Sequence, residues 1–273
     1  MILCLLQNYL NELRNKNIMK NVKAKKYLGQ HFLKNKSIAE KITDLLNIKN
    51  TELIEIGPGM GVLTQFLLKK YNPILIEIDK ESVTYLNKKY PKLKHQIINE
   101  DFLKLNLKKY DKNISLIGNF PYNISSQILF KILENRNQIF EVVGMFQKEV
   151  AERIVAKKGR KRGILSVLLQ SFYNIEYCLN VNKEEFYPIP KVESGVIKFT
   201  KNNRDSLNCD ELLFKKIVKT SFNQRRKTLR NALKPFTLLQ TNNIKNLLNL
   251  RAEELSVDEF ITITKNVKGN KNK

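Results

Sequence analysis

One short segment restricts the fold of this chain more than any other. Thr51–Ile54 leads in as a short strand, and Glu55–Gly61 follows with glycines at positions 57, 59 and 61. Val62–Leu68 then has the apolar spacing of an amphipathic helix. Glycine tolerates positive φ angles and lets the backbone approach a ligand closely. The segment therefore predicts a strand, a ligand-wrapping turn and a helix, as in a parallel α/β sheet.

The spacing of these glycines limits the class of ligand. They lie closer together than in the G-x-G-x-x-G pattern of dinucleotide-binding turns, and no Lys-Ser or Lys-Thr pair follows them, as a phosphate loop requires. Both features disfavour NAD and ATP. A nucleoside cofactor without phosphates, such as S-adenosylmethionine, suits the turn, with Gly57 and Gly59 as its predicted contacts.

An acidic residue follows the next strand-like segment. Pro73–Ile76 is apolar and meets Glu77, where a carboxylate can accept hydrogen bonds from both hydroxyls of a ribose. Asp79 is a rival for this role, two residues further on. We favour Glu77 because it comes first at the carboxyl end of the apolar run.

A third strand-like segment, Gln96–Asn99, leads to Asp101 and Phe102. Asp101 could accept a hydrogen bond from the adenine amino group of the cofactor, and Phe102 could flank its ring. A single acid at a strand end is more often a helix cap or a solvated loop carboxylate. Because the carboxyl ends of parallel strands converge on one crevice, the series as a whole favours one cofactor site.

A fourth strand-like run, Ser115–Gly118, leads to the tetrapeptide Asn119–Tyr122. The exocyclic amine of adenine is a poor nucleophile because its lone pair is delocalised into the ring. The tetrapeptide offers a side-chain carbonyl at Asn119, a backbone carbonyl at Phe120 stiffened by Pro121, and an aromatic face at Tyr122. These groups predict a site that methylates an adenine amine, although the same residue types also occur in ordinary strand-to-loop turns.

The charge of the chain predicts a polyanionic partner. The formal net charge is +23, part of which could reflect a general bias of composition. Two clusters argue for phosphate contacts instead, because a diffuse bias would spread its charge more evenly. The predicted RNA-binding residues of these clusters are Lys157, Lys158, Arg160, Lys161, Arg162, Arg225, Arg226, Lys227 and Arg230.

Cysteine and histidine are too sparse to build a metal site. The cysteines are Cys4, Cys178 and Cys209, and the histidines are His31 and His95. Few scattered thiols suit a reducing cytosol, and no apolar run approaches the length of a membrane span. We therefore expect a cytoplasmic protein without a metal or a membrane partner.

Strand-like and helical segments alternate before the polar stretch 201–206, and helical periodicity begins at Glu211. This order predicts a doubly wound α/β domain followed by a smaller C-terminal α-helical domain. The expected divisions are a disordered extension over residues 1–20, the α/β domain over 21–202 and the helical domain over 203–273.

The chain resembles the small-subunit ribosomal RNA adenine N6,N6-dimethyltransferases from about Lys25 to the C-terminus. Several separate blocks carry the resemblance, in addition to the glycine turn: Tyr27–Leu33, Asn119–Ser126, Met145–Arg153 and Phe186–Gly195. The resemblance implies a Rossmann-like class I methyltransferase domain, and an RNA-facing accessory role for residues 203–273.

The resemblance also implies roles for individual residues. Gln30, His31 and Leu33 would hold the methionine end of the cofactor, with Asn119 beside it. His31 stands where many members of the family carry Asn, and a neutral imidazole can still donate one hydrogen bond. Phe186 is our candidate for stacking on the face of the substrate base opposite Tyr122.

The function implied is transfer of methyl groups from S-adenosylmethionine to N6 of two adjacent adenosines in the 3′-terminal hairpin of small-subunit (16S) ribosomal RNA. The substrate would lie in a 30S or pre-30S particle, and the free enzyme would be a monomer. Two alternatives stay open. One is an adenine N6-methyltransferase for large-subunit RNA or DNA, and the other is a non-catalytic ribosome-assembly factor on the same fold.

Overall fold

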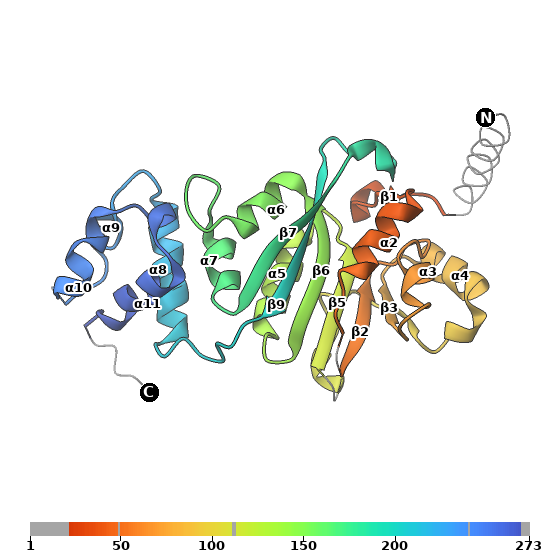
Figure 1. The fold of residues 1–273 in the computed structure, drawn as a ribbon, viewed down its shortest axis with the longest axis horizontal. Coiled ribbons are helices and arrows are strands. Elements are labelled where there is room, and N and C mark those ends of the chain that lie inside the picture. The colour runs from red at the N-terminus through yellow and green to blue at the C-terminus, as the bar shows by residue number, and fades with distance from the viewer. Residues whose placement is uncertain (1–21, 49, 111–112, 240, 269–273) are drawn as a thin grey trace. The chain divides into compact units, whose positions relative to one another are not determined.

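The computed structural model describes residues 22–48, 50–110, 113–239 and 241–268 (Figure 1). The extension predicted for residues 1–20 lies outside the described residues. The strands are β1 (Phe32–Leu33), β2 (Thr51–Ile56), β3 (Ile74–Glu77), β4 (Ile97–Asn99), β5 (Asn113–Asn119), β6 (Ile139–Gln147), β7 (Tyr173–Val181), β8 (Phe186–Tyr187) and β9 (Ser194–Lys201). The α-helices are α2 (Lys36–Asp44), α3 (Thr64–Leu67), α4 (Lys80–Lys89), α5 (Ser125–Glu134), α6 (Lys148–Val155), α7 (Ile164–Gln170), α8 (Glu211–Asn223), α9 (Leu229–Ala232), α10 (Asn242–Lys245) and α11 (Val257–Lys265).

Seven strands form one sheet in the order β4-β3-β2-β5-β6-β9-β7, part of which is visible side by side in Figure 1. The pairs β3/β4, β2/β3, β2/β5 and β5/β6 are all parallel. The chain runs outward from β2 to β4 and then returns to β5 on the other side of β2. This arrangement confirms the predicted doubly wound α/β fold, with its topological switch point between β2 and β5.

Local sequence explains where these elements begin. Residues 114–118 of β5 are all buried, as expected for a central parallel strand covered on both faces. Asp79 caps α4 by accepting a hydrogen bond from the Glu81 amide at 3.2 Å, and Ser256 caps α11 by accepting from the Glu259 amide at 3.2 Å. The helix predicted over residues 62–68 is shorter than expected, because only Thr64–Leu67 is α-helical and turns flank it.

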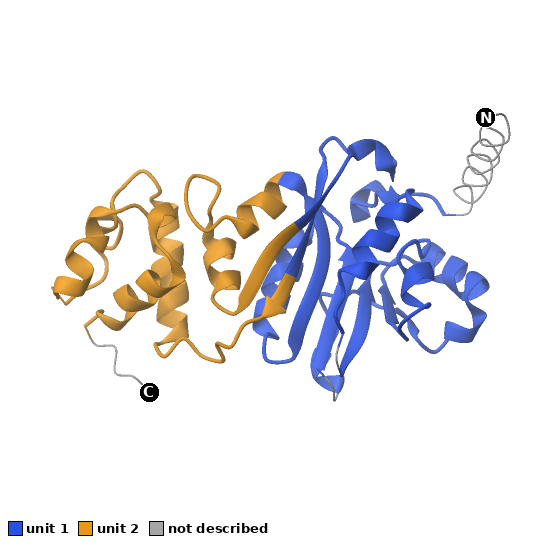
Figure 2. Ribbon diagram, in the orientation of Figure 1, with its two compact units in different colours: residues 1–148, 178–198 blue, residues 149–177, 199–273 orange. Residues whose placement is uncertain are grey.

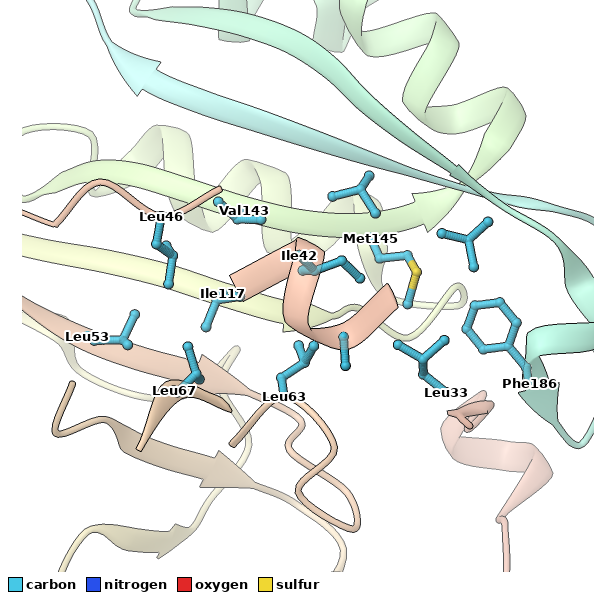
Figure 3. Packing of buried hydrophobic residues seen from close by; sticks show 13 residues of the cluster. Leu33, Ile42, Leu46, Leu53, Leu63, Leu67, Ile117, Val143, Met145 and Phe186 are labelled. Carbon is cyan, nitrogen blue, oxygen red and sulfur yellow. The ribbon is translucent and has the colours of Figure 1, made fainter. Parts of the chain in front are cut away.

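The hydrophobic core cluster shown in Figure 3 holds α2 and α3 against one face of the sheet. Ile42 of α2 and Leu67 of α3 are fully buried in this cluster together with Ile117 of β5 and Val143 of β6. The cluster therefore packs against the two strands, β5 and β6, that lead to Asn119 and Met145. Burying one such aliphatic side chain contributes about 1.5–3 kcal/mol relative to leaving it exposed.

The chain divides into two compact units (Figure 2). The first holds residues 1–148 and 178–198, and the second holds 149–177 and 199–273. The second unit thus takes in α6, α7 and the helices α8 to α11. The separate domain proposed from sequence for residues 203–273 remains a prediction. In the part of the chain that the structure describes, no helix is long and apolar enough to cross a bilayer.

Candidate active site

A cavity in the first unit lies at the carboxyl ends of β2, β3 and β5, next to the switch point where an α/β sheet binds ligands. Its empty space amounts to about 920 Å³, part of which is open to solvent. The cavity brings together most of the residues predicted for the cofactor and the substrate base. These are Gln30, His31, Gly57, Gly59, Glu77, Asp101, Phe102, Asn119, Phe120, Pro121 and Tyr122.

The glycine turn has the backbone that its sequence predicts. Gly57, Gly59 and Gly61 have φ angles of 65°, 55° and 72°, which disfavour residues with a Cβ. A Cβ built on Gly57 would meet nothing within 4 Å, whereas one on Gly59 would lie 2.9 Å from the Phe32 ring. Gly57 therefore leaves open space beside the cavity, and this geometry fits a nucleoside cofactor held close to the backbone.

Glu77 is held rigidly at the end of β3. Its Oε2 accepts a hydrogen bond from the Gly59 amide at 2.9 Å, and its Oε1 accepts one from the Asp79 amide at 2.9 Å. The side chain is buried, and this burial raises the pKa of its carboxyl group. A carboxylate has about four acceptor sites, so two stay available for ligand hydroxyls.

Asp79 is occupied elsewhere. Its carboxylate pairs with the Lys25 ammonium, accepts from the Ser82 hydroxyl at 2.9 Å and accepts from the Gln30 amide at 3.3 Å. It does not line the cavity, whereas Glu77 does. Of the two acids, the geometry favours Glu77 for contact with a ribose.

Asp101 and Phe102 lie on the turn that follows β4. The Asp101 Oδ1 accepts a hydrogen bond from the Leu103 amide at 2.9 Å. Lys131 of α5 holds the same turn, because its ammonium donates to the Leu103 carbonyl at 2.9 Å and to the Leu105 carbonyl at 2.6 Å. The ammonium also lies 5.3 Å from the Phe102 ring centroid, a cation–π distance. Sequence spacing offers no signal for Lys131, which follows Phe102 by 29 positions.

The Asn119 amide has a defined orientation. Its Nδ2 donates a hydrogen bond to the His31 carbonyl at 2.7 Å, so Oδ1 is the end left to accept. The Phe120 amide donates to the Met145 carbonyl at 3.1 Å and extends the β5/β6 ladder. Among the described residues, no group donates to Asn119 Oδ1 or to the Phe120 carbonyl oxygen. Two acceptors from adjacent residues are thus available at the cavity.

Tyr122 is supported from two sides. Its hydroxyl shares a hydrogen bond of 2.6 Å with Ser194, and its ring stacks on His31 at 5.5 Å between centroids with 28° between planes. The His31 Nδ1 lies 2.7 Å from the Pro188 carbonyl, which can only accept, so Nδ1 carries a proton. Burial raises the pKa of the Tyr122 phenol above its usual range. His31 therefore braces both Tyr122, through its ring, and Asn119, through its carbonyl.

Two predicted site residues, Leu33 and Phe186, do not line this cavity. Both side chains belong to the hydrophobic core cluster, where Figure 3 shows them near Met145. Phe186 has an exposed fraction of 0%. The expectation that its ring stacks on a base is corrected here, because neither face is open to a ligand. Leu33 lines a smaller adjoining hollow together with Gly57 and Asn119.

A buried acid beneath the glycine turn was not singled out from the sequence. Glu55 is 1% exposed, lines the smaller hollow, and its Oε2 accepts a hydrogen bond from the Thr64 hydroxyl at 2.6 Å. Burial raises the pKa of this carboxyl group to about 8. Because Glu55 and Thr64 flank the glycine turn, their hydrogen bond ties the end of β2 to the start of α3.

The basic residues predicted to bind RNA lie in the second unit. All of them are exposed except Arg162, which is 1% exposed. Burial lowers the pKa of Arg162 to about 10, and its Nε and Nη2 make no hydrogen bond to any described residue. The prediction that Arg162 contacts phosphate is therefore wrong for this conformation, because the guanidinium cannot reach the surface.

Arg225 joins the two clusters of basic residues. The Arg225 Nη2 donates to the Arg160 carbonyl at 2.6 Å and to the Arg162 carbonyl at 3.1 Å. This contact ties residues 157–162 to the end of α8, although more than 60 positions separate them in the chain. The two clusters found in the sequence thus lie side by side within the second unit.

A family model described as ribosomal RNA adenine dimethylase matches residues 21–268. The chain belongs to this family. Relatives called ribosomal RNA small subunit methyltransferase A, from Flavobacterium johnsoniae and Cytophaga hutchinsonii, are 57% and 54% identical. The matches cover 91% and 92% of this chain and 97% and 100% of the relatives. The dimethyladenosine transferase from Plasmodium falciparum is 26% identical, with a TM-score of 0.73 over 85% of this chain and 96% of that one.

Membership of the ribosomal RNA adenine dimethylase family confirms the resemblance drawn from the sequence blocks, and with it the class of enzyme, a methyltransferase. The structural similarity confirms the Rossmann-like fold. The roles of individual residues stay predictions, which the geometry of the cavity makes specific.

Proposed function

We propose that this chain transfers methyl groups from S-adenosylmethionine to N6 of two adjacent adenosines in the 3′-terminal hairpin of small-subunit ribosomal RNA, giving N6,N6-dimethyladenosines. The observation that carries the proposal is the pair of acceptors at the end of β5. Asn119 presents Oδ1 because Nδ2 is held by the His31 carbonyl, and the neighbouring Phe120 carbonyl is also available. The names of the two relatives support the small subunit over the large subunit or DNA as the source of the adenosines.

In this proposal the residues of the first unit hold the cofactor as follows. Gly57 and Gly59 give it close access to the backbone, Glu77 accepts from the ribose hydroxyls, and Asp101 with Phe102 receives the adenine. Gln30 and His31 lie towards the methionine end. When bound, S-adenosylmethionine supplies a sulfonium methyl group that a nucleophile can attack directly.

Two acceptors from the chain prepare the attacking amine. In the first transfer, Asn119 Oδ1 and the Phe120 carbonyl accept the two hydrogens of the adenine amine, which draws the nitrogen lone pair out of the ring and towards the methyl group. A bond then forms between nitrogen and the methyl carbon as the sulfur–carbon bond breaks. The product nitrogen is ammonium-like and loses its proton to water or a nearby acceptor, so no strong base is required. Positioning and exclusion of water supply most of the acceleration.

Tyr122 captures the target base. Its ring is backed by His31 on one side, so its other face is the one we assign to the adenine. The target base must leave its stack to enter the cavity, at a cost of a few kcal/mol. A fixed aromatic surface offsets part of this cost, since stacking of one base contributes about 1–3 kcal/mol.

The RNA backbone is bound by the exposed basic side chains of the second unit. Lys157, Lys158, Arg160 and Lys161 lie in one loop, and Arg226, Lys227 and Arg230 follow α8. Arg225 joins these two groups through its contacts with the loop carbonyls. Such contacts with phosphates strengthen binding without reading sequence. We propose a cytoplasmic enzyme, monomeric when free, that acts on a 30S or pre-30S particle without a resident metal.

The proposal is tested by mapping N6,N6-dimethyladenosine in ribosomal RNA from cells with and without this gene. Mass spectrometry of nuclease fragments should find two adjacent dimethylated adenosines near the 3′ end of the small-subunit RNA only when the gene is present. Restoring an active gene should restore both modifications. Unchanged small-subunit RNA, or loss of a modification from large-subunit RNA or DNA instead, would overturn the proposed substrate.

A further inference from the structure

Two glycines outside the cofactor turn lie directly opposite each other in the sheet. Gly118 of β5 and Gly144 of β6 are register partners in the parallel pair. Neither has a positive φ angle, so the backbone itself would accept any residue at these positions. Both are buried. The need for glycine here must therefore come from neighbouring atoms that leave no room for a Cβ.

The ring of Phe120 is the neighbour that both positions share. A Cβ on Gly118 would lie 2.5 Å from the Ile56 carbonyl oxygen and 2.7 Å from the Phe120 ring, and a Cβ on Gly144 would lie 2.6 Å from the other edge of that ring and 2.6 Å from the Phe146 ring. The Phe120 ring meets Phe146 edge to face, with centroids 5.1 Å apart and an angle of 83°. Phe120 is 1% exposed. Gly118, Gly144 and Phe146 thus form a closed seat, which we call the Phe120 socket.

The socket holds the residue whose carbonyl is one of the two proposed catalytic acceptors. Phe120 is anchored twice, by its ring in the socket and by its amide on the Met145 carbonyl at 3.1 Å. With these two anchors in place, the remaining polar group of the residue is its carbonyl, the proposed acceptor for the adenine amine. Asn119 lies between the seated Phe120 and Gly118, so the same anchor limits movement of its backbone.

We infer that Gly118 and Gly144 are positioning residues for methyl transfer. They leave room for the Phe120 ring, and the seated ring holds the Phe120 carbonyl and the Asn119 amide against the reacting amine. The inference rests on the proposed function. Contacts below 3.0 Å force a neighbouring atom to move, and on Gly144 both close neighbours are ring atoms. Misplacing reacting groups by about 1 Å can cost about 100-fold in rate.

The test compares single-turnover methyl transfer to small-subunit particles in the parent and in Gly144→Ala. The added methyl group should unseat Phe120 and slow transfer by at least about tenfold, because the acceptors lose their alignment. The dissociation constants for S-adenosylmethionine and for the particle should change much less than the rate, because most of the residues proposed to hold the cofactor and the RNA lie outside the socket.

Rescue by a smaller side chain separates positioning from general packing damage. Phe120→Leu removes the ring atoms that the new methyl group meets and leaves room for Phe146 to adjust. The double variant Gly144→Ala/Phe120→Leu should therefore transfer methyl groups faster than Gly144→Ala alone, by about fivefold or more, as expected for coupled neighbours. Gly163→Ala is the matched control, because its new Cβ would lie 3.5 Å from Arg153, an ordinary contact, and its rate should equal the parental rate.

Three results would overturn the inference. They are a parental transfer rate in Gly144→Ala, a loss of cofactor binding in that variant equal to its loss of rate, and a double variant no faster than the single one. Failure of the proposed function is distinct, because the parent itself would then leave small-subunit particles unmethylated.

Discussion

Replacing Glu77 by alanine should weaken cofactor binding with little effect on RNA binding. The carboxylate is buried, and each of its oxygens already accepts one backbone hydrogen bond, from Gly59 and from Asp79. The two acceptor sites that remain match the two hydroxyls of a ribose. The variant removes both of these acceptors and also leaves the Gly59 amide of the glycine turn and the Asp79 amide without their partner.

The size of the effect follows from these contacts. A hydrogen bond to a charged group contributes about 1.5–3 kcal/mol, so two ribose contacts amount to about 3–6 kcal/mol before water refills the vacated space. Water recovers part of this free energy. A net loss above about 1.4 kcal/mol corresponds to at least about tenfold weaker binding, which is the change we expect.

Isothermal titration calorimetry with S-adenosylmethionine measures this change. Asp79→Asn is the control, because Asp79 does not line the cavity and asparagine keeps an oxygen to cap α4. Its dissociation constant should stay within about threefold of the parent, a difference below about 1 kcal/mol. An unchanged constant in Glu77→Ala, with a large increase in Asp79→Asn, would refute our assignment of the ribose contact.

Three further predictions concern pH, RNA and the base. The carboxyl group of Glu55 has a pKa of 4.5 ordinarily and of about 8 in the folded protein, so between these two pH values it holds a proton only in the folded state. The free energy of unfolding should therefore fall by about 1.4 kcal/mol per pH unit as the pH rises through this window. Glu55→Gln should flatten this fall in denaturant titrations from about pH 5 to about pH 9, and parallel pH profiles would contradict the burial argument. Changing Arg225, Arg226 and Lys227 together to glutamine should reduce the slope of log binding constant against log salt concentration by about one for each phosphate that is no longer neutralised, and cofactor affinity should not change. An identical slope in the variant and the parent would mean that these side chains are solvated and do not contact phosphates. Tyr122→Ala should weaken capture of the substrate by about 1–3 kcal/mol, measured as an increase in KM. Tyr122→Phe removes only the hydrogen bond to Ser194 and should keep most of the activity. Equal losses of activity in the two variants would show that the hydroxyl matters more than the ring.

The residues that directly follow the buried strands were the part of the site that the sequence could predict. A glycine turn and an acid must follow buried strands directly, so Gly57, Glu77 and Asp101 could be placed at one crevice from spacing and from the geometry of parallel sheets. Their common cavity depends only on strand order, which the switch point between β2 and β5 supplies.

Side chains whose position depends on distant packing could not be placed in this way. Phe186 is separated from Leu33 by more than 150 positions, yet the two share one core cluster, so its burial left no local pattern. Arg162 resembles its exposed neighbours in sequence, although it turns inward. The support of Tyr122 by His31 and Ser194 is equally non-local, as is the fit of Phe120 over Gly144.

The central claim is tested most directly by single-turnover transfer of a labelled methyl group, in which the parent is compared with Asn119→Ala. The substrate in both cases is small-subunit particles that lack the modification. The parent should produce N6,N6-dimethyladenosine at two adjacent positions. Asn119→Ala should be slower by about two orders of magnitude, the usual effect of removing one preorganised hydrogen-bonding group. Its affinities for S-adenosylmethionine and for the particle should change much less, because the acceptor acts mainly as the amine attacks. Transfer by Asn119→Ala at the parental rate would contradict the account, because the reacting amine would then be held by other residues.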